Sequence, residues 1–241
     1  MIKTNTRGLK FKVEGKIFEN INNAYFGVVI ARNIDNAKFQ DFIKDMLSES
    51  VNKVISEYSN TSIKEHPSIN CYREAFRKVD INPNKFMCSI EALVTRVVKK
   101  GELPSINPLV DLGNALSLKY SIPIGLHDID GFDGDIELRY TTKDDVFIPI
   151  GCSEKEVIDD NEISYVSGHD IKTRKWAWRQ GDKGKITEYS KNIFIPLDGF
   201  TDINKKQIED MQKELVEILE NKFGADCIIG FVDKDNPEFN F

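Results

Sequence analysis

The spacing of apolar positions is mostly that of helices up to about residue 121 and mostly that of short strands after it. A continuous apolar run at Ala24–Arg32, rich in β-branched and aromatic residues, predicts a buried strand. From Asn36 to about Tyr58, apolar residues recur at steps of three and four, which predicts an amphipathic helix.

Three more helices are predicted before residue 121, at about 71–79, 89–100 and 108–120. Ser89 is expected to cap the second of them, and Gly101 is expected to end it. Pro108 suits the first turn of the third helix, since its missing N–H leaves no helical hydrogen bond unmade.

Beyond Ile122 the spacing favours short strands separated by Gly or Asp turns, followed by one helix from about Asn204 to Phe223 that Gly224 ends. The expected strands are 135–140, 146–150, 162–166, 172–180, 191–197 and 227–232. We therefore expect an α+β fold of mixed sheets flanked by helices. We expect a single interlocked unit over residues 1–241, helix-rich to about 121 and strand-rich from about 122.

Composition narrows the function classes without choosing one. The chain has 241 residues, 40% hydrophobic and 30% charged, which is typical of a globular protein rather than a disordered one. The net charge of −6 means that any RNA contact needs a local basic patch. No apolar run reaches the roughly 18 residues of a membrane span, and the N-terminus lacks the apolar core of a secretory signal.

The cysteines and histidines are scattered, and no pair has the spacing of a metal site. Cys71, Cys88, Cys152 and Cys227 form no CxxC motif, which favours reduced thiols and a cytoplasmic location over a disulfide framework. We expect neither a metal nor a cofactor.

Both tryptophans lie in the basic segment 174–187. As an extended strand, residues 174–180 would place Arg174, Trp176, Trp178 and Gln180 on one face. That face is suited to stacking on bases while cations hold phosphate. The alternative is that the indoles anchor a core and the cations are solvated.

Four carboxylates lie close together in the stretch 127–135, at Asp128, Asp130, Asp133 and Asp135. A calcium loop of the EF-hand type needs an oxygen ligand at its fifth position, where this stretch has Phe132. The residue types favour a tight turn into the next strand. His127, next to Asp128, is also a candidate polarised base.

Two segments, 105–140 and 174–195, resemble the third and fourth domains of the β subunit of bacterial phenylalanyl-tRNA synthetase. Those domains form the editing module, which hydrolyses tyrosine wrongly attached to the phenylalanine tRNA. The chain is more similar still to free-standing proteins that carry only this module, over about residues 25–200. The Trp-x-Trp-Arg-Gln motif at 176–180 is part of that similarity.

The resemblance implies a set of site residues in this chain. Asn114, Asp111 and Asp182 would line the amino-acid pocket and orient water. The substrate would also contact Asn107, Gly125, Gly181 and His127, while Trp178, Arg174 and Arg179 would face the tRNA 3′ end or shape the pocket.

The sequence departs from the family pattern at two of these positions. Gly113 stands where the family has Thr, and Gly125 stands where it has His. His127 follows two residues later, so it is not a simple substitute. We expect these glycines to remove polar partners and enlarge the pocket, which weakens the case for tyrosine specificity.

The resemblance therefore implies an enzyme of translation quality control, a hydrolase that removes a mischarged amino acid from tRNA. A second reading is a non-catalytic module of the same fold that binds tRNA or a free amino acid. A third is an enzyme acting on a small molecule unrelated to tRNA, which the acidic net charge favours. Amino-acid activation is not expected, because the chain has no P-loop and is too short for a complete synthetase.

Overall fold

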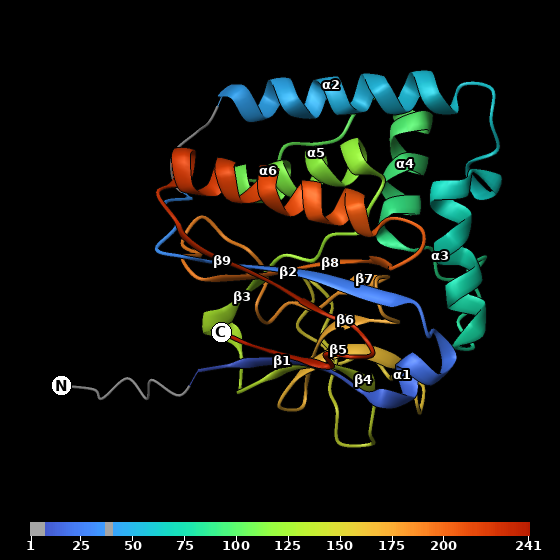
Figure 1. The fold of residues 1–241 in the computed structure, drawn as a ribbon, viewed down its shortest axis with the longest axis vertical. Helices are drawn as coiled ribbons and strands as arrows, with labels where there is room; N and C mark the ends of the chain where they lie inside the picture. The colour runs from blue at the N-terminus through green and yellow to red at the C-terminus, as the bar shows by residue number, and fades with distance from the viewer. Residues whose placement is uncertain (1–7, 37–40) are drawn as a thin grey trace.

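The structure is a computed structural model that describes residues 8–36 and 41–241. Its elements are stacked in layers, with helices on one side and two sheets below them (Figure 1). Helix α2 (Asp41–Tyr58) packs on α5 (Pro108–Tyr120), and α5 contacts α6 (Lys205–Phe223). Both α5 and α6 cover one face of a four-stranded sheet.

The four-stranded sheet has the order β3-β8-β2-β9. It consists of β3 (His127–Asp128), β8 (Ile193–Phe200), β2 (Ala24–Arg32) and β9 (Asp226–Val232). Its central strands are apolar on both faces because both faces are covered. In β2, Tyr25 and Val29 pack with the helices, whereas Phe26 and Val28 pack toward the second sheet.

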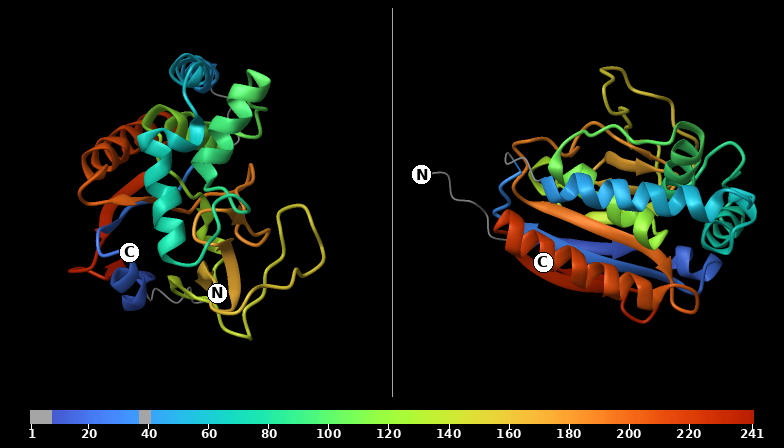
Figure 2. Two further views of the ribbon diagram at one scale, coloured as in Figure 1. Left: turned by 90° about the vertical axis from the view of Figure 1, so that its right-hand side faces the viewer. Right: turned by 90° about the horizontal axis from the view of Figure 1, so that it is seen from above.

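The second sheet has six strands in the order β10-β1-β4-β5-β6-β7. Its strands are β10 (Glu238–Asn240), β1 (Lys10–Val13), β4 (Ile136–Tyr140), β5 (Ile163–Ser167), β6 (Asp170–Arg174) and β7 (Arg179–Gln180). An aromatic cluster joins the two sheets: the ring of Phe11 lies 6.1 Å from that of Phe26, 5.8 Å from that of Tyr165 and 5.1 Å from that of Phe194. The segment between β4 and β5 projects from this body (Figure 2).

The remaining helices stand at one end of the sheets (Figure 1). They are α1 (Gly15–Asn20), α3 (Pro67–Lys78) and α4 (Ser89–Lys100), together with the short 3₁₀ turn η1 (Ile63–Glu65). A second 3₁₀ turn, η2 (Ile129–Gly131), directly follows β3. A buried ion pair joins α3 to α4, with Nη1 of Arg73 2.7 Å from Oε1 of Glu91. None of the described helices is long and apolar enough to cross a membrane.

The α+β fold is confirmed, and most predicted elements lie where expected. Three local expectations are wrong. Ser89 is the first helical residue of α4 rather than its cap, since Cys88 precedes the helix and makes no side-chain cap bond. Residues 146–150 form only isolated bridges, and residues 172–180 do not form one continuous strand.

Candidate functional site

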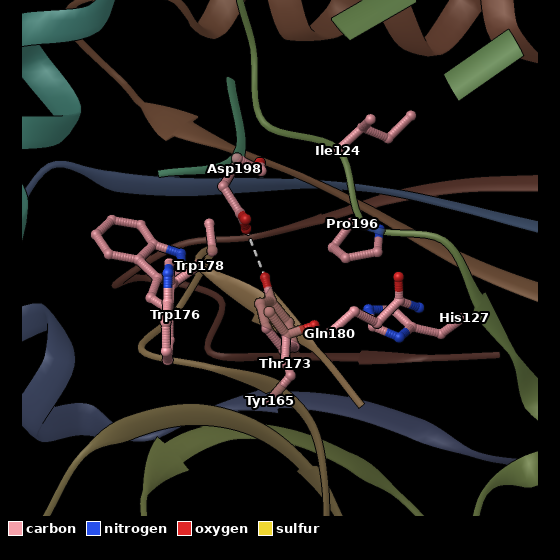
Figure 3. A pocket seen from close by; sticks show the side chains of 12 residues that line it. Ile124, His127, Tyr165, Thr173, Trp176, Trp178, Gln180, Pro196 and Asp198 are labelled. Carbon is pink, nitrogen blue, oxygen red and sulfur yellow. Dashed lines mark hydrogen bonds between the residues drawn. The ribbon is translucent and has the colours of Figure 1, made fainter. Parts of the chain in front are cut away.

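A pocket of about 110 Å³ lies between the two sheets. Each sheet contributes to its wall, as do the first residue of α4 and the turn between β6 and β7 (Figure 3). The lining residues are Ser89, Ile124, Gly125, His127, Tyr165, Thr173, Trp176, Ala177, Trp178, Gln180, Pro196 and Asp198.

His127 is the least satisfied polar side chain of this pocket. Its residue is 1% exposed, and neither ring nitrogen has a hydrogen-bond partner among the described residues. Burial lowers the pKa of His127 to about 3, and the charge of Lys172 contributes. The imidazole is therefore neutral at pH 7, with one N–H to donate and one nitrogen to accept. A buried ring with both functions unused is suited to a ligand that enters the pocket.

The imidazole of His127 lies in the space that a side chain at position 125 would need. A Cβ at position 125 would lie 2.9 Å from Nε2 of His127 and 2.8 Å from Cγ of Pro196. Side chains two residues apart on an extended chain point to the same side, so an imidazole at 127 can reach the space that a side chain at 125 would enter. The imidazole of His127 therefore lies where a side chain at position 125 would begin.

The expectation that glycines enlarge the pocket is wrong for the same reason. At Gly113, a Cβ would lie 2.7 Å from Cδ1 of Leu126, so the side chain of Leu126 already fills that space. At Gly125, His127 and Pro196 fill it.

A buried carboxylate, Asp198, lines the same pocket. It lies two residues before the end of β8 and is 3% exposed. The hydroxyl of Tyr165 donates to its Oδ1 at 2.5 Å, the contact drawn as a dashed line in Figure 3. Burial raises the pKa of Asp198 to about 7, while Tyr165 and the nearby indole of Trp176 act to lower it. Nε1 of Trp176 reaches no acceptor in hydrogen-bond geometry, so Tyr165 is the side-chain partner that holds this carboxyl.

The predicted tryptophan strand is a tight turn between β6 and β7. Lys175 and Trp176 have φ of 47° and 64°, in the left-handed region that few non-glycine residues enter. The turn places Trp176 in the core, with its ring 6.1 Å from that of Phe26 and 5.8 Å from that of Phe76. Trp178 is half-buried at the pocket wall against Phe86. Trp176 therefore anchors the core, whereas Trp178 lies where a ligand in the pocket could contact it.

The cations of this segment are held by carboxylates. Arg174 is 6% exposed, and its Nε and Nη2 each donate to Glu162 at 2.8 Å. Lys175 donates to Glu162 at 2.9 Å and to Asp159 at 2.7 Å. Arg174 is therefore not a solvent-facing phosphate contact. Arg179 is more accessible, and it pairs with Glu156 at 2.8 Å.

The three residues expected to orient water do not line the pocket. Asp111 is an acceptor for the N–H of Ile106 and the hydroxyl of Ser105, ahead of α5. Asp182 accepts from the N–H of Gly151 and from Lys185, and these bonds lower its pKa. Asn114 is half-buried on α5 outside the pocket.

Two other expected residues have backbone roles. The side chain of Asn107 caps α5 by accepting from the N–H of Val110 at 3.1 Å. Gly181 lies so close to the carbonyl of Ile171 that a Cβ there would be 2.5 Å from it. Of the site residues that the resemblance implies, the pocket brings together Gly125, His127 and Trp178. Trp176 and Gln180, predicted to share a face with Trp178, also line it.

Asp198 and Tyr165 are absent from the predicted site. The signal for Asp198 is present in the sequence, since it is the only charged residue in the otherwise apolar strand 193–200. A carboxylate in a buried strand needs a partner or a function. Tyr165 carries no such signal, because a tyrosine in a strand is ordinary.

The acidic residues 128–135 act as turn and ladder contacts. Asp128 accepts from the N–H of Asp130 and from the hydroxyl of Ser190. Asp135 accepts from the backbone N–H of Lys10 and from the ammonium group of Lys12. Within residues 8–36 and 41–241, no group of three His, Cys, Asp or Glu side chains is arranged to hold a metal ion.

Comparison with known proteins identifies the family. The protein-family model for the B3/4 domain matches residues 71–215. This match spans more than half of the chain and includes every residue of the pocket. The chain belongs to the B3/4 domain family. The predicted resemblance to the module of the synthetase β subunit is thereby confirmed.

A relative of the chain is the phenylalanine–tRNA ligase beta subunit of Idiomarina loihiensis, 26% identical over 103 residues. That match covers 42% of this chain and 13% of the ligase subunit. A solved structure similar to the chain is an N-terminal fragment of the phenylalanyl-tRNA synthetase beta subunit from Pyrococcus horikoshii, with a TM-score of 0.48 and 12% identity. It is matched over 90% of this chain and 49% of the fragment, so the chain spans about half of that fragment's length.

Proposed function

We propose that this B3/4 protein is a tRNA-associated hydrolase that removes an amino acid from mischarged tRNA in trans. The observation that carries the proposal is His127, a buried imidazole with both nitrogens unpartnered on the wall of a pocket inside the family segment. The family relationship to a tRNA ligase subunit supports an aminoacyl ester as the ligand.

One requirement of ester hydrolysis, a hydrogen-bond donor for the developing oxyanion, is available in the pocket. An aminoacyl ester is already activated, so a positioned water and donors for the developing oxyanion account for most of the catalysis. A neutral imidazole donates one hydrogen bond without carrying charge, which suits an oxyanion or a carbonyl oxygen. Because its pKa is about 3, His127 acts in this proposal as a hydrogen-bond donor and not as a general base.

The size of the pocket supports a small amino acid over tyrosine. Its volume of about 110 Å³ is below the roughly 150 Å³ of an engineered apolar cavity that binds benzene. Trp178, Pro196 and Ile124, whose side chains are stiff or branched, form part of the wall that bounds this volume.

Deacylation of a panel of tRNAs carrying glycine, alanine, serine, valine or tyrosine tests the proposal. Purified full-length protein is expected to clear at least one of the smaller esters well above the protein-free rate, and to clear the tyrosyl ester slowest. His127→Phe keeps a ring of similar size without its hydrogen bonds, and it is expected to lower the rate about 100-fold, as loss of one oxyanion donor does. No clearance of any ester at micromolar protein would contradict a hydrolytic function.

A non-catalytic B3/4 module is the second candidate. The displacement of Asp111, Asn114 and Asp182 from the pocket favours it, since no group remains there that was expected to orient water. Binding of aminoacyl-tRNA without turnover in the same panel would support this candidate over the first.

A further inference from the structure

The described part of the chain contains five buried carboxylates, and four of them have charged or backbone partners. Glu91 pairs with Arg73, Glu162 with Arg174, and Asp145 with Arg139 at 2.8 Å. Asp111 accepts a backbone N–H and a hydroxyl. Asp198 is the fifth, and within residues 8–36 and 41–241 no cation neutralises it.

The groups that face Asp198 from neighbouring elements are all neutral near pH 7. Tyr165 on β5 and Tyr72 on α3 have pKa values raised well above 10 by burial. Burial also raises the pKa of the Cys88 thiol ahead of α4. His127 on β3, which lines the same pocket, is neutral because burial lowers its pKa to about 3.

Asp198 is therefore a buried acceptor that faces a pocket and has one side-chain donor, Tyr165. A buried carboxylate without a counter-charge is costly, and a cation that entered the pocket would remove that cost. A primary ammonium group is small, positive and offers three donors.

We propose that Asp198, with Tyr165 orienting it, binds the ammonium group of the ligand, so that this pocket selects molecules with a free primary amine. In this proposal, which rests on the proposed function, the ligand is an aminoacyl ester and the ammonium group is its α-amino group. Tyr165 donates to one carboxylate oxygen, and Asp198 reserves its remaining acceptor capacity for the ligand.

The proposal links binding to protons. Below pH 7 the empty pocket holds Asp198 mostly protonated, so an ammonium ligand must displace a proton. Affinity for an amine should rise with pH up to about 7 and level off until the ligand's own amine deprotonates, near pH 7.7–8.0 for an α-amino group.

The binding experiment uses alaninamide, which has a primary amine, and propionamide, which lacks it. Isothermal titration at pH 5.5 and 7.5, in buffers of different ionisation enthalpy, measures affinity and proton release. Alaninamide is expected to bind more tightly, with proton release at pH 5.5. Asp198→Asn should weaken it about 10- to 100-fold, the effect of one charge-assisted hydrogen bond, and leave propionamide unchanged. Asp235→Asn, an exposed carboxylate far along the chain, is the control.

The activity experiment uses one tRNA esterified with alanine or with lactate, which has a hydroxyl in place of the amine. The wild-type protein should clear the alanyl ester at least tenfold faster, and Asp198→Asn should remove that preference. Equal clearance of both esters by the wild type overturns the ammonium site and leaves the proposed function standing. Selective binding of alaninamide without clearance of either ester overturns the hydrolase and supports the ammonium site. Equal affinity for alaninamide and propionamide overturns the ammonium site in either case.

Discussion

At the scale of single residues, the pocket depends on a side chain that is missing at position 125. His127 can occupy its place because Gly125 has no Cβ to obstruct it. The imidazole of His127 thus lies beside position 125, although its residue comes two positions later in the sequence.

Gly125→Ala tests this arrangement. The added methyl would lie 2.9 Å from Nε2 of His127 and 2.8 Å from Cγ of Pro196, so the imidazole or the strand must move. We expect a loss of stability of about 1–3 kcal/mol, typical of overpacking, together with a marked loss of ligand binding. Urea denaturation and alaninamide titration measure the two effects.

Gly15→Ala is the matched control, because a Cβ there meets no atom within 4 Å and the residue does not have a positive φ. It should leave ligand binding unchanged and should not destabilise the protein. Full binding by Gly125→Ala at wild-type stability would show that His127 and residue 125 do not compete for space.

At the scale of elements, the hairpin of β6 and β7 shows where sequence periodicity loses its predictive power. Residues 172–180 have the composition of a strand, yet Lys175 and Trp176 adopt left-handed backbone angles and reverse the chain. Local propensity opposes those angles, and long-range contacts favour them, since Glu162 binds Lys175 and the core receives Trp176. Such a turn depends on partners distant in sequence, so periodicity alone does not predict it.

The elements that were predictable are those whose pattern is long and whose burial is simple. The strand β2 follows from its continuous apolar run, and the helices α4, α5 and α6 follow from apolar spacing and from Pro or Gly at their ends. The short strands β1 and β10 do not, because three or four residues are too few for a period to appear. Residues 146–150 have the apolar composition of a strand, and Phe147 is buried, but the segment forms only isolated bridges and no continuous ladder.

The same hairpin gives a prediction about its two arginines. Arg174→Ala would leave Glu162 with Lys175 as its remaining cation in a buried site, and removal of one partner of a buried pair typically costs about 3–5 kcal/mol. Arg179→Ala breaks an exposed pair with Glu156, which is worth about 0–1 kcal/mol. Thermal and urea unfolding of both variants measure the difference.

The two variants also separate structure from tRNA contact. If Arg179 faces the nucleic acid, Arg179→Ala should weaken tRNA binding and reduce its salt dependence at nearly wild-type stability. Equal stability of the two variants would contradict the burial of the Arg174–Glu162 pair.

At the scale of the whole molecule, the pocket lies in the layer where the two sheets meet, and its lining comes from several separate segments of the chain. Strands β3 and β8 bring His127 and Asp198, while β5 brings Tyr165. Sequence reasoning reaches the family and one wall of the pocket through motifs. It does not reach the carboxylate, because the pairing of β8 with its neighbours decides which side chains meet.

The two buried titratable groups of the pocket should act in opposite directions on stability. The pKa of His127 falls from 6.5 to about 3 on folding, so its contribution is present above pH 6.5 and is lost as the pH falls toward 3. The pKa of Asp198 rises from 3.8 to about 7, so its contribution is present below pH 3.8 and is lost as the pH rises through 7. Between about pH 4 and 6.5 the two slopes, each about 1.4 kcal/mol per pH unit at most, oppose one another.

Asp198→Asn removes the pH dependence of stability that comes from Asp198 and leaves the one that comes from His127. The variant's free energy of unfolding, relative to the wild type, should therefore increase as the pH rises from 4 to 7, and by pH 8 the gain should approach ~4 kcal/mol, the equivalent of a pKa shift from 3.8 to about 7. Urea denaturation at pH 4.5, 5.5, 6.5 and 8 measures it, with Asp235→Asn expected to follow the wild type. A difference between Asp198→Asn and the wild type that stays constant over this range would mean that Asp198 titrates as an ordinary carboxyl, and the case for an unpaired buried acid in the pocket would fail with it.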